Sequence, residues 1–298
     1  MKSYLDCIPC FLRQGLESAR MATDDEAVHE RVLRELLLAV PKLDMRQSPP
    51  VMGQRIHRLI RELTGKSDPY REIKDQFNRV ALELYPELKA RVGRSGNPIE
   101  AAVRVAIAGN IIDCGVNNDL DEAHVRHTLE DAFAEPLNGD VRDFVDVISA
   151  AEDILYLADN AGEIIFDRLL IEQMPREKIT VVVRGGPVIN DATMDDAIVA
   201  GLLELVEVID NGSDAPGTIL EDCSERFRKR FDEAGLVIAK GQGNYETLSG
   251  VEKDMFFMLK VKCPVIARDI GCEVGSLVLQ RSERSAVGVE GDSEHAET

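Results

Sequence analysis

The sequence lacks the features that mark membrane-spanning and secreted proteins. Its 298 residues include no Trp and only 5% aromatic residues, and no apolar run approaches the roughly 20 residues that span a membrane. The N-terminal segment has no long apolar core of the kind found in secretory signals. We therefore expect a cytoplasmic protein without a membrane partner.

Motifs for common cofactors are missing as well. No Gly-x-Gly-x-x-Gly follows an apolar run, and neither Gly-x4-Gly-Lys-Ser/Thr nor Gly-x-Ser-x-Gly occurs. The histidines lie away from the strand ends predicted in the C-terminal half, which argues against a histidine metal triad or base there. They are His29, His57, His124, His127 and His295.

The charge balance is strongly acidic, with 54 Asp and Glu residues against 35 Lys and Arg and a formal net charge of −19. Such a surface repels the phosphates of nucleic acid, so we expect no nucleic-acid partner. A small anionic ligand is still compatible, because a metal ion or one lysine can reverse the potential inside a cleft.

Six cysteines are spread along a long chain that we expect in the cytoplasm, which argues against a disulfide framework. Only Cys7-Ile-Pro-Cys10 has the spacing of metal ligands or a redox pair, and a zinc site would need two more ligands. Cys263 and Cys272 could supply them only if the two ends of the chain meet. Otherwise Cys7 and Cys10 are ordinary thiols.

The pattern of apolar residues divides the chain near residue 150. Residues 1–150 predict a helical N-terminal domain, with amphipathic helices over 24–40, 50–64 and 69–92. Residues 98–113 are apolar on almost every side, so we expect a buried helix that lines a cleft.

Residues 151–280 alternate short β-rich runs with helical segments. Continuous apolar runs indicate strands covered on both faces, and the alternation predicts an α/β domain with a doubly wound, mostly parallel sheet. The runs are 153–158, 179–184, 205–209, 235–240 and 263–267. Residues 281–298 are expected to form a disordered acidic tail.

Polar side chains follow the ends of these predicted strands, where open α/β sheets bind ligands. Asp159, Asn160 and Asp191 offer hard oxygen donors that suit Mg²⁺ or Mn²⁺. Lys240 offers a charge for a phosphate oxygen, and Gly241 would let backbone amides approach an anion. The sequence therefore predicts a metal and phosphate site at one edge of the sheet.

Helix capping is the alternative explanation for part of this pattern. Asn160-Ala-Gly-Glu163 fits an N-cap with an acid at the third helical position, and Thr193-Met-Asp-Asp196 fits a capping box. Asp159 is harder to explain in this way, because a carboxylate at the end of a buried strand is costly to leave unpaired.

Taken together, these segments resemble the damage-control phosphatase family, formerly a domain of unknown function, whose eukaryotic members have also been described as acidic-residue methyltransferases. The Cys7-x-x-Cys10 segment is similar to that of its microbial branch. The matching segments are Asp159-Asn160-Ala-Gly-Glu163 with Asp167, Arg184-x-x-Pro187-x-x-Asn190-Asp191, Lys240-Gly-x-Gly-Asn244, Gly109-Asn110-Ile-Ile-Asp113 and Asp68-Pro69-Tyr70.

The resemblance implies a three-layer α/β/α core and a divalent metal, Mn²⁺, Ni²⁺, Co²⁺ or Mg²⁺, held by Asp159, Asn160 and Asp191. It implies that Lys240 contacts the substrate phosphate. We expect Glu163 to act as a second-shell or water-positioning group of the catalytic set. The further expected substrate-binding residues are Asn110, Arg184, Gly241 and Asn244.

The expected activity is metal-dependent hydrolysis of small phosphorylated metabolites, either sugar phosphates or damaged phospho-cofactors. The metal would polarise the phosphoryl group and activate water. Two alternatives stay open: a non-catalytic metal- or metabolite-binding protein, and an S-adenosylmethionine-dependent carboxyl methyltransferase. The sequence indicates no oligomeric state.

Overall fold

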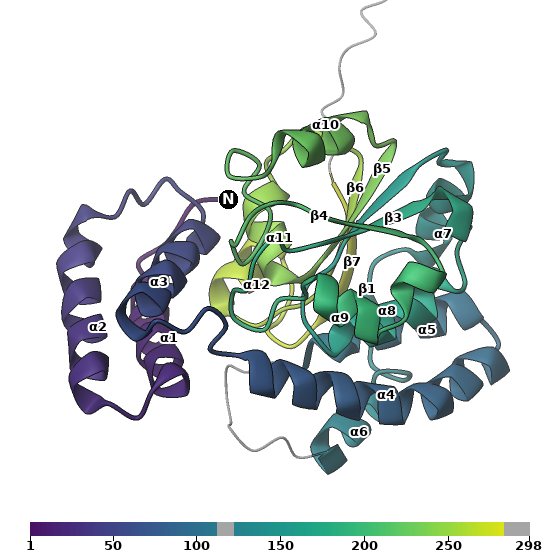
Figure 1. The fold of residues 1–298 in the computed structure, drawn as a ribbon. Helices are drawn as coiled ribbons and strands as arrows, with labels where there is room; N and C mark the ends of the chain where they lie inside the picture. The colour runs from purple at the N-terminus through teal and green to yellow at the C-terminus, as the bar shows by residue number, and fades with distance from the viewer. Residues whose placement is uncertain (112–121, 283–298) are drawn as a thin grey trace, which may run out of the picture.

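A seven-stranded sheet forms the centre of the protein in the computed structural model, which describes residues 1–111 and 122–282 (Figure 1). The strand order is β1-β7-β6-β5-β2-β3-β4, and every neighbouring pair is parallel except β6 and β7. The strands are β1 (Leu137–Asn138), β2 (Ile154–Leu157), β3 (Ile179–Val183), β4 (Glu207–Asp210), β5 (Leu236–Lys240), β6 (Met255–Lys260) and β7 (Leu277–Arg281).

Helices cover both faces of the sheet, which confirms the three-layer α/β/α fold (Figure 1). Along β2, Ile154 and Tyr156 face one hydrophobic cluster while Leu155 and Leu157 face the other. One face carries α4 (Arg71–Arg94), α5 (Pro98–Ala108), α6 (Glu122–Asp131), α7 (Val141–Ala150), α8 (Glu163–Ile171) and α9 (Met194–Val199). The other carries α10 (Glu225–Glu233), α11 (Gly241–Leu248) and α12 (Pro264–Ile270).

The first three helices form a bundle with its own hydrophobic core beside the sheet (Figure 1). They are α1 (Cys7–Ala22), α2 (Glu26–Ala39) and α3 (Pro49–Thr64). The boundary predicted at residue 150 therefore does not match the packing, which divides the chain between α3 and α4. The reason is that α4, α5 and α7 complete a layer of the sheet instead of packing with the bundle.

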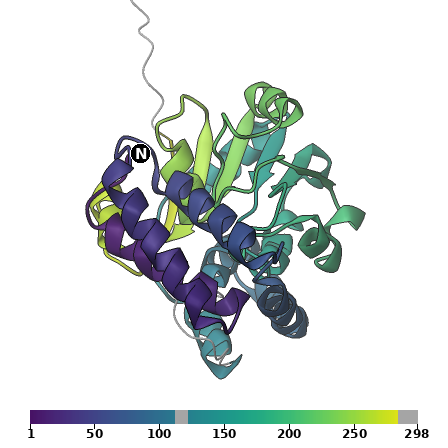
Figure 2. The same cartoon turned by 60° about the vertical axis from the view of Figure 1, so that its left-hand side comes forward.

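The bundle rests against the C-terminal part of the chain, as both views of the ribbon show (Figure 2). The amino group of Met1 donates to the carbonyl of Glu246 at 2.8 Å, and Arg268 pairs with Asp6. Ion pairs from α3 to Asp214, which follows β4, fasten the same face; Arg58 approaches to 2.5 Å. The N-terminal residues are thus held against the segments around Glu246 and Arg268.

One predicted strand is wrong. Cys263 is the N-cap of α12 and residues 264–267 lie in that helix, whereas the strand in that region is β6, which the pattern missed. Pro264 occupies the first turn of α12, where its fixed φ suits a helix and its missing N–H costs nothing.

The predicted buried helix 98–113 is α5 followed by the 3-10 helix η2 (Gly109–Ile111). Residues 112, 113 and 283–298, with most of the predicted tail, lie outside the described residues.

No helix in the described ranges, 1–111 and 122–282, is long and apolar enough to cross a membrane.

The strand order reverses direction between β2 and β5, so this point is the topological switch of the parallel part of the sheet. Asp159 follows β2 and Gly241 follows β5, and the two chain segments are in close contact there. A Cβ atom on Gly241 would lie 1.9 Å from Asp159 Oδ2, and the φ of Gly241 is +78°. Only glycine leaves room for this carboxylate.

We expect Gly241→Ala to destabilise the fold more than Gly271→Ala. Gly271 has a similar φ of +82° but no atom within 4 Å of a built Cβ, so it is a matched control. Alanine at either position lowers the free energy of unfolding by roughly 1 kcal/mol, because it must adopt the left-handed backbone conformation. At Gly241 the overlap with Asp159 adds about 1–3 kcal/mol. Urea unfolding of both variants measures the difference, and equal losses would show that Asp159 moves aside freely.

Candidate active site at the carboxyl edge of the sheet

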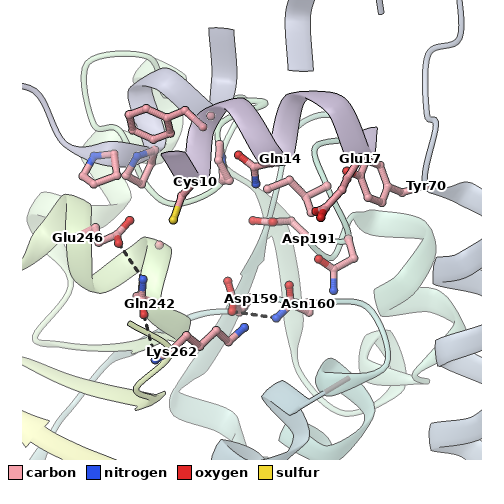
Figure 3. Close-up of a pocket in the computed structure, with 18 of the residues that line it drawn as sticks. Cys10, Gln14, Glu17, Tyr70, Asp159, Asn160, Asp191, Gln242, Glu246 and Lys262 are labelled. Carbon is pink, nitrogen blue, oxygen red and sulfur yellow. Dashed lines mark hydrogen bonds between the residues drawn. The ribbon is translucent and has the colours of Figure 1, made fainter. Parts of the chain in front are cut away.

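A polar cavity of about 300 Å³ lies above the switch point, between the bundle and the sheet (Figure 3). Asp159, Asn160 and Asp191 form its floor at the ends of β2 and β3. Helix α1 contributes Cys10, Gln14 and Glu17, and the segment after β5 and β6 contributes Gln242, Glu246 and Lys262. The cavity therefore needs residues from both ends of the chain.

The two floor loops are joined by backbone hydrogen bonds that bring the three predicted metal ligands together. The amide of Ala192 donates to the Asp159 carbonyl at 2.7 Å, and the amide of Ala161 donates to the Asn190 carbonyl at 2.8 Å. Beyond the parallel pairing of β2 and β3, these bonds form a separate antiparallel bridge in which Asn160 lies opposite Asp191.

Two amides hold the carboxylates of Asp159 and Glu163 together beneath the floor. Asn110 Nδ2 donates to Asp159 Oδ2 at 2.8 Å and to Glu163 Oε2 at 2.6 Å. Asn160 Nδ2 donates to the same two oxygens at 2.9 Å and 2.8 Å. Since an amide oxygen points away from its own NH₂ group, the Oδ1 atom of Asn160 is directed away from both carboxylates.

Lys240 is completely buried below this layer and uses its three N–H groups on acceptors within the protein. Nζ lies 2.9 Å from the Ala106 carbonyl, 2.7 Å from Glu163 Oε1 and 2.5 Å from Asp167 Oδ1. Tyr156 also donates to Asp167 Oδ1. Burial acts to lower the pKa of Lys240, but the carboxylates of Asp167 and Glu163 outweigh it and hold that pKa above its usual range.

Arg184 is the second buried cation of the site. Its Nε donates to Asp191 Oδ2 at 2.6 Å, and its Nη2 lies 3.9 Å from Asp159 Oδ1. Nη1 contacts Thr218 and Asn244, whereas Nη2 has no hydrogen-bond acceptor among the residues that the structure describes. A buried guanidinium group with an unused donor beside two carboxylates is suited to an anionic oxygen.

Negative charge exceeds positive charge around the floor. The buried acids are Asp159, Glu163, Asp167 and Asp191, against Lys240 and Arg184, which leaves an excess of two negative charges if all are ionised. Burial and the neighbouring carboxylates of Glu163 and Asp191 raise the pKa of Asp159 well above its usual range. A divalent cation would remove this excess, and the carboxylate and amide oxygens of the floor are donors that it prefers.

The floor set contains two carboxylates and one amide. Within residues 1–111 and 122–282, no group of three or more His, Cys, Asp or Glu side chains is placed to hold a metal ion. The amide of Asn160 falls outside that residue set, and the buried Asn110 Oδ1 atom has no partner among the described residues. The donor chemistry and the charge excess fit a metal that keeps part of its water shell.

The two capping alternatives have different outcomes. Gly162 is the N-cap of α8 and Glu163 its first residue, so the capping interpretation of Asn160 and Glu163 is wrong. The side-chain amide of Asn160 instead donates to Glu163 and to Asp159. The capping box of Thr193 and Asp196 is confirmed, and Asp196 also pairs with the buried Lys74 at 2.9 Å.

The predicted substrate-binding residues lie below the cavity surface. Among the described residues that line the cavity, none is Asn110, Arg184, Lys240, Gly241 or Asn244. Asn244 orders this layer, since its Nδ2 donates to the Lys240 carbonyl at 2.8 Å and its Oδ1 accepts from Thr218. A direct contact of Lys240 with substrate would require it to give up one of its three acceptors.

Apart from Cys10, the cavity residues on α1 and α11 were not predicted from the sequence. Cys10, Gln14 and Glu17 recur at the helical spacing of four and three residues, so a polar stripe on one face of α1 was a usable signal. Gln242 and Glu246 are similarly spaced on α11. A polar helix face is more often solvated, so only the fold reveals that these stripes face a cavity.

The predicted Cys7–Cys10 site lies at the edge of this cavity. Cys10 lines it, while Cys7 is half-buried and accepts a hydrogen bond from the amide of Tyr4. Burial raises the pKa of the Cys7 thiol, and the nearby Glu246 and Cys263 add to this. The fold does bring Cys263 close to the N-terminal pair. A metal or redox role for Cys7 and Cys10 stays a prediction.

Comparison with known proteins shows which family the chain belongs to. Residues 3–278 match the family described as the damage-control phosphatase ARMT1-like domain. A damage-control phosphatase of Archaeoglobus fulgidus is 38% identical over 278 residues, which cover 91% of this chain and 96% of that protein. A damage-control phosphatase of Pyrococcus horikoshii is 34% identical over 95% of this chain and 99% of its own length.

A solved structure of this family also has the same fold as the chain. The crystal structure of a DUF89 family protein from Pyrococcus horikoshii superimposes with a TM-score of 0.86 at 32% identity, covering 95% of this chain and 100% of that one. An uncharacterised protein of Methanocaldococcus jannaschii is 35% identical over 92% of this chain and 93% of its own length. The chain therefore belongs to the damage-control phosphatase ARMT1-like family, as its strand-end motifs had indicated.

Proposed function

We propose that the protein is a divalent-metal-dependent phosphomonoesterase that hydrolyses small phosphorylated metabolites. The observation that carries this proposal is the excess of buried carboxylates at the floor of a polar cavity, directly beside an arginine with an unused donor. Family membership and the two relatives that are named phosphatases support it.

Asp159, Asn160 and Asp191 would hold the metal, and the candidates are Mn²⁺, Ni²⁺, Co²⁺ and Mg²⁺, in keeping with the hard oxygen donors. A bound divalent ion supplies Lewis-acid polarisation of the phosphoryl group and activation of water. Asn110 and Asn160 fix the carboxylate of Asp159 through Oδ2 and thereby keep the floor in one arrangement.

The buried cations of the protein would stabilise the negative charge that develops on the phosphoryl group during hydrolysis, either directly or by positioning other groups. Arg184 lies below the cavity surface, and its Nη2, which has no acceptor among the described residues, would donate to a phosphoryl oxygen that enters the space between Asp159 and Asp191. We assign Lys240 a positioning role, because its ion pairs with Glu163 and Asp167 hold both side chains in place below the floor. Glu163 in turn orients Asn110 and Asn160.

The cavity favours a small, polar substrate. A volume of about 300 Å³ lies at the lower end of the range for ligand sites, which favours small groups. Its roof and walls carry Gln14, Glu17 and Gln242, which can bond to hydroxyl groups. Sugar phosphates and damaged phospho-cofactors of similar size fit these properties.

We expect phosphate release from sugar phosphates only after a divalent metal is returned to metal-stripped protein. Asp159→Asn should lower both the metal content and the rate, with a rate loss of at least about 100-fold, because it removes one charged ligand from the floor. The assay compares Mg²⁺, Mn²⁺, Co²⁺ and Ni²⁺, and metal content is measured separately by elemental analysis.

Asp210→Asn is the matched control, since Asp210 also ends a strand of the sheet but is exposed and bonds only locally, to the Gly212 amide. It should keep the full rate. Metal bound through Asp159 without release from any ester would favour a binding protein. Transfer of labelled methyl groups to carboxylates would favour the methyltransferase.

We also expect Lys240→Met to remove activity and to lower the free energy of unfolding by about 3–5 kcal/mol, because it leaves Glu163 and Asp167 buried without their cation. Adding Asp167→Asn should recover part of that stability and none of the activity.

Lys74→Met is the control for this experiment. Lys74 is equally buried and pairs with Asp196, but it lies outside the floor. It should cost similar stability and retain phosphate release at a temperature where the variant is folded. Full activity of Lys240→Met would overturn the positioning role.

A further inference from the structure

We propose that Glu246 is the proton donor to the ester oxygen that leaves the phosphorus atom. The proposal rests on the phosphatase activity proposed above. It adds a residue of α11 that belongs to none of the strand-end motifs and that stands in the cavity wall.

The geometry of α11 places Glu246 at a suitable distance from the floor. The helix begins at Gly241, which touches Asp159, and Glu246 comes five residues later. With a rise of 1.5 Å per residue, its Cα lies about 7.5 Å farther along the helix axis. Figure 3 shows Asp159 in the floor and Glu246 in the wall of the same cavity, so the proposal places the ester oxygen of a phosphoryl group bound at the floor between these two carboxyl groups.

The carboxyl group of Glu246 is held from one side only. Gln242 Nε2 donates to Oε1 at 2.9 Å, and no bond to Oε2 is recorded among residues 1–111 and 122–282. Gln242 is itself fixed, because its Oε1 accepts from the Lys262 amide. Figure 3 shows this chain of contacts along the cavity wall. Glu246 is thus oriented and still has an oxygen for a substrate.

The surroundings keep the proton on Glu246 near neutral pH. Burial raises its pKa to about 7, against the lowering effects of the Gln242 hydrogen bond, the Met1 amino group and Lys262. The Cys7 thiol is a further titratable group that interacts electrostatically with the carboxyl group of Glu246. A bound phosphate dianion would raise the pKa further, so the acid form is favoured when substrate is present.

The proposed step is balanced with water as co-reactant. The bond between phosphorus and the ester oxygen breaks, and its electron pair stays on that oxygen, which takes the proton of Glu246. A bond forms between phosphorus and the oxygen of the attacking water. One proton of that water remains on the product phosphate and the other returns to Glu246 through solvent. The products are an alcohol and hydrogen phosphate.

The other buried acids are less suited to this task. Glu163 and Asp167 are fully buried and both bind Lys240, and Asp159 and Asp191 form the floor. Glu17 also lines the cavity, but it comes from α1 in the roof. It therefore provides a matched control for a cavity carboxyl group.

The test uses leaving groups of different basicity on the full-length protein loaded with metal. Single-turnover rates are measured for phenyl phosphate and 4-nitrophenyl phosphate, which have the same shape around the ester oxygen. We expect Glu246→Gln to slow phenyl phosphate by about 100-fold, because phenolate needs a proton. The less basic nitrophenolate leaves without one, so 4-nitrophenyl phosphate should change by less than about threefold.

The pH profile gives a second readout. The wild-type rate on phenyl phosphate should fall as pH rises through about 7, where Glu246 loses its proton, and this limb should vanish in Glu246→Gln. Glu17→Gln should alter KM while keeping the wild-type ratio between the two esters and the wild-type pH limb.

Equal slowing of both esters by Glu246→Gln, or a change confined to KM, would overturn the role of Glu246 and leave the phosphatase assignment intact. Absence of turnover by the wild-type protein with every metal and ester would overturn the proposed function itself, and the role of Glu246 with it.

Discussion

The buried ion pair of Lys240 with Glu163 and Asp167 is the interaction on which the rest of the site depends. Three acids that follow β2 within nine residues would repel one another in a low-dielectric interior. Lys240 arrives from β5, the neighbouring strand at the switch point, and offsets two of them. Glu163 is then able to order Asn110 and Asn160, and these amides order Asp159.

Helix α1 and its bundle cover this edge of the sheet and turn it into a partly open cavity. The parallel sheet alone would present its polar loops to solvent, as open α/β sheets do. Contacts of α3 with Asp214 and of Met1 with Glu246 place α1 above the floor. Water is thereby limited around the carboxylates, which strengthens the electrostatic interactions there. The same enclosure gives the cavity walls that meet the part of the substrate beyond its phosphate.

Individual strands and helices show which structural features local sequence patterns predict and which they do not. The runs that became β2, β3 and β5 were clear because a strand buried on both faces must be apolar throughout. The segment 263–267 was equally apolar, but Pro264 makes it the start of a helix. The division at residue 150 failed because amphipathic periodicity shows that α4 and α5 bury one face, and does not show what that face is buried against.

The sequence by itself determined the fold class, the family and the three residues of the floor, because strand periodicity and strand-end motifs are local properties of the chain. It also indicated that Asp159 needs a partner, since a buried carboxylate cannot be left alone. Only the tertiary structure decided that Lys240 lies beneath the floor and that α1 and α11 supply the cavity wall. The reason is that such contacts join residues far apart in the sequence, as Met1 and Glu246 are, with a separation of 245 positions. No local pattern encodes which distant surfaces will meet.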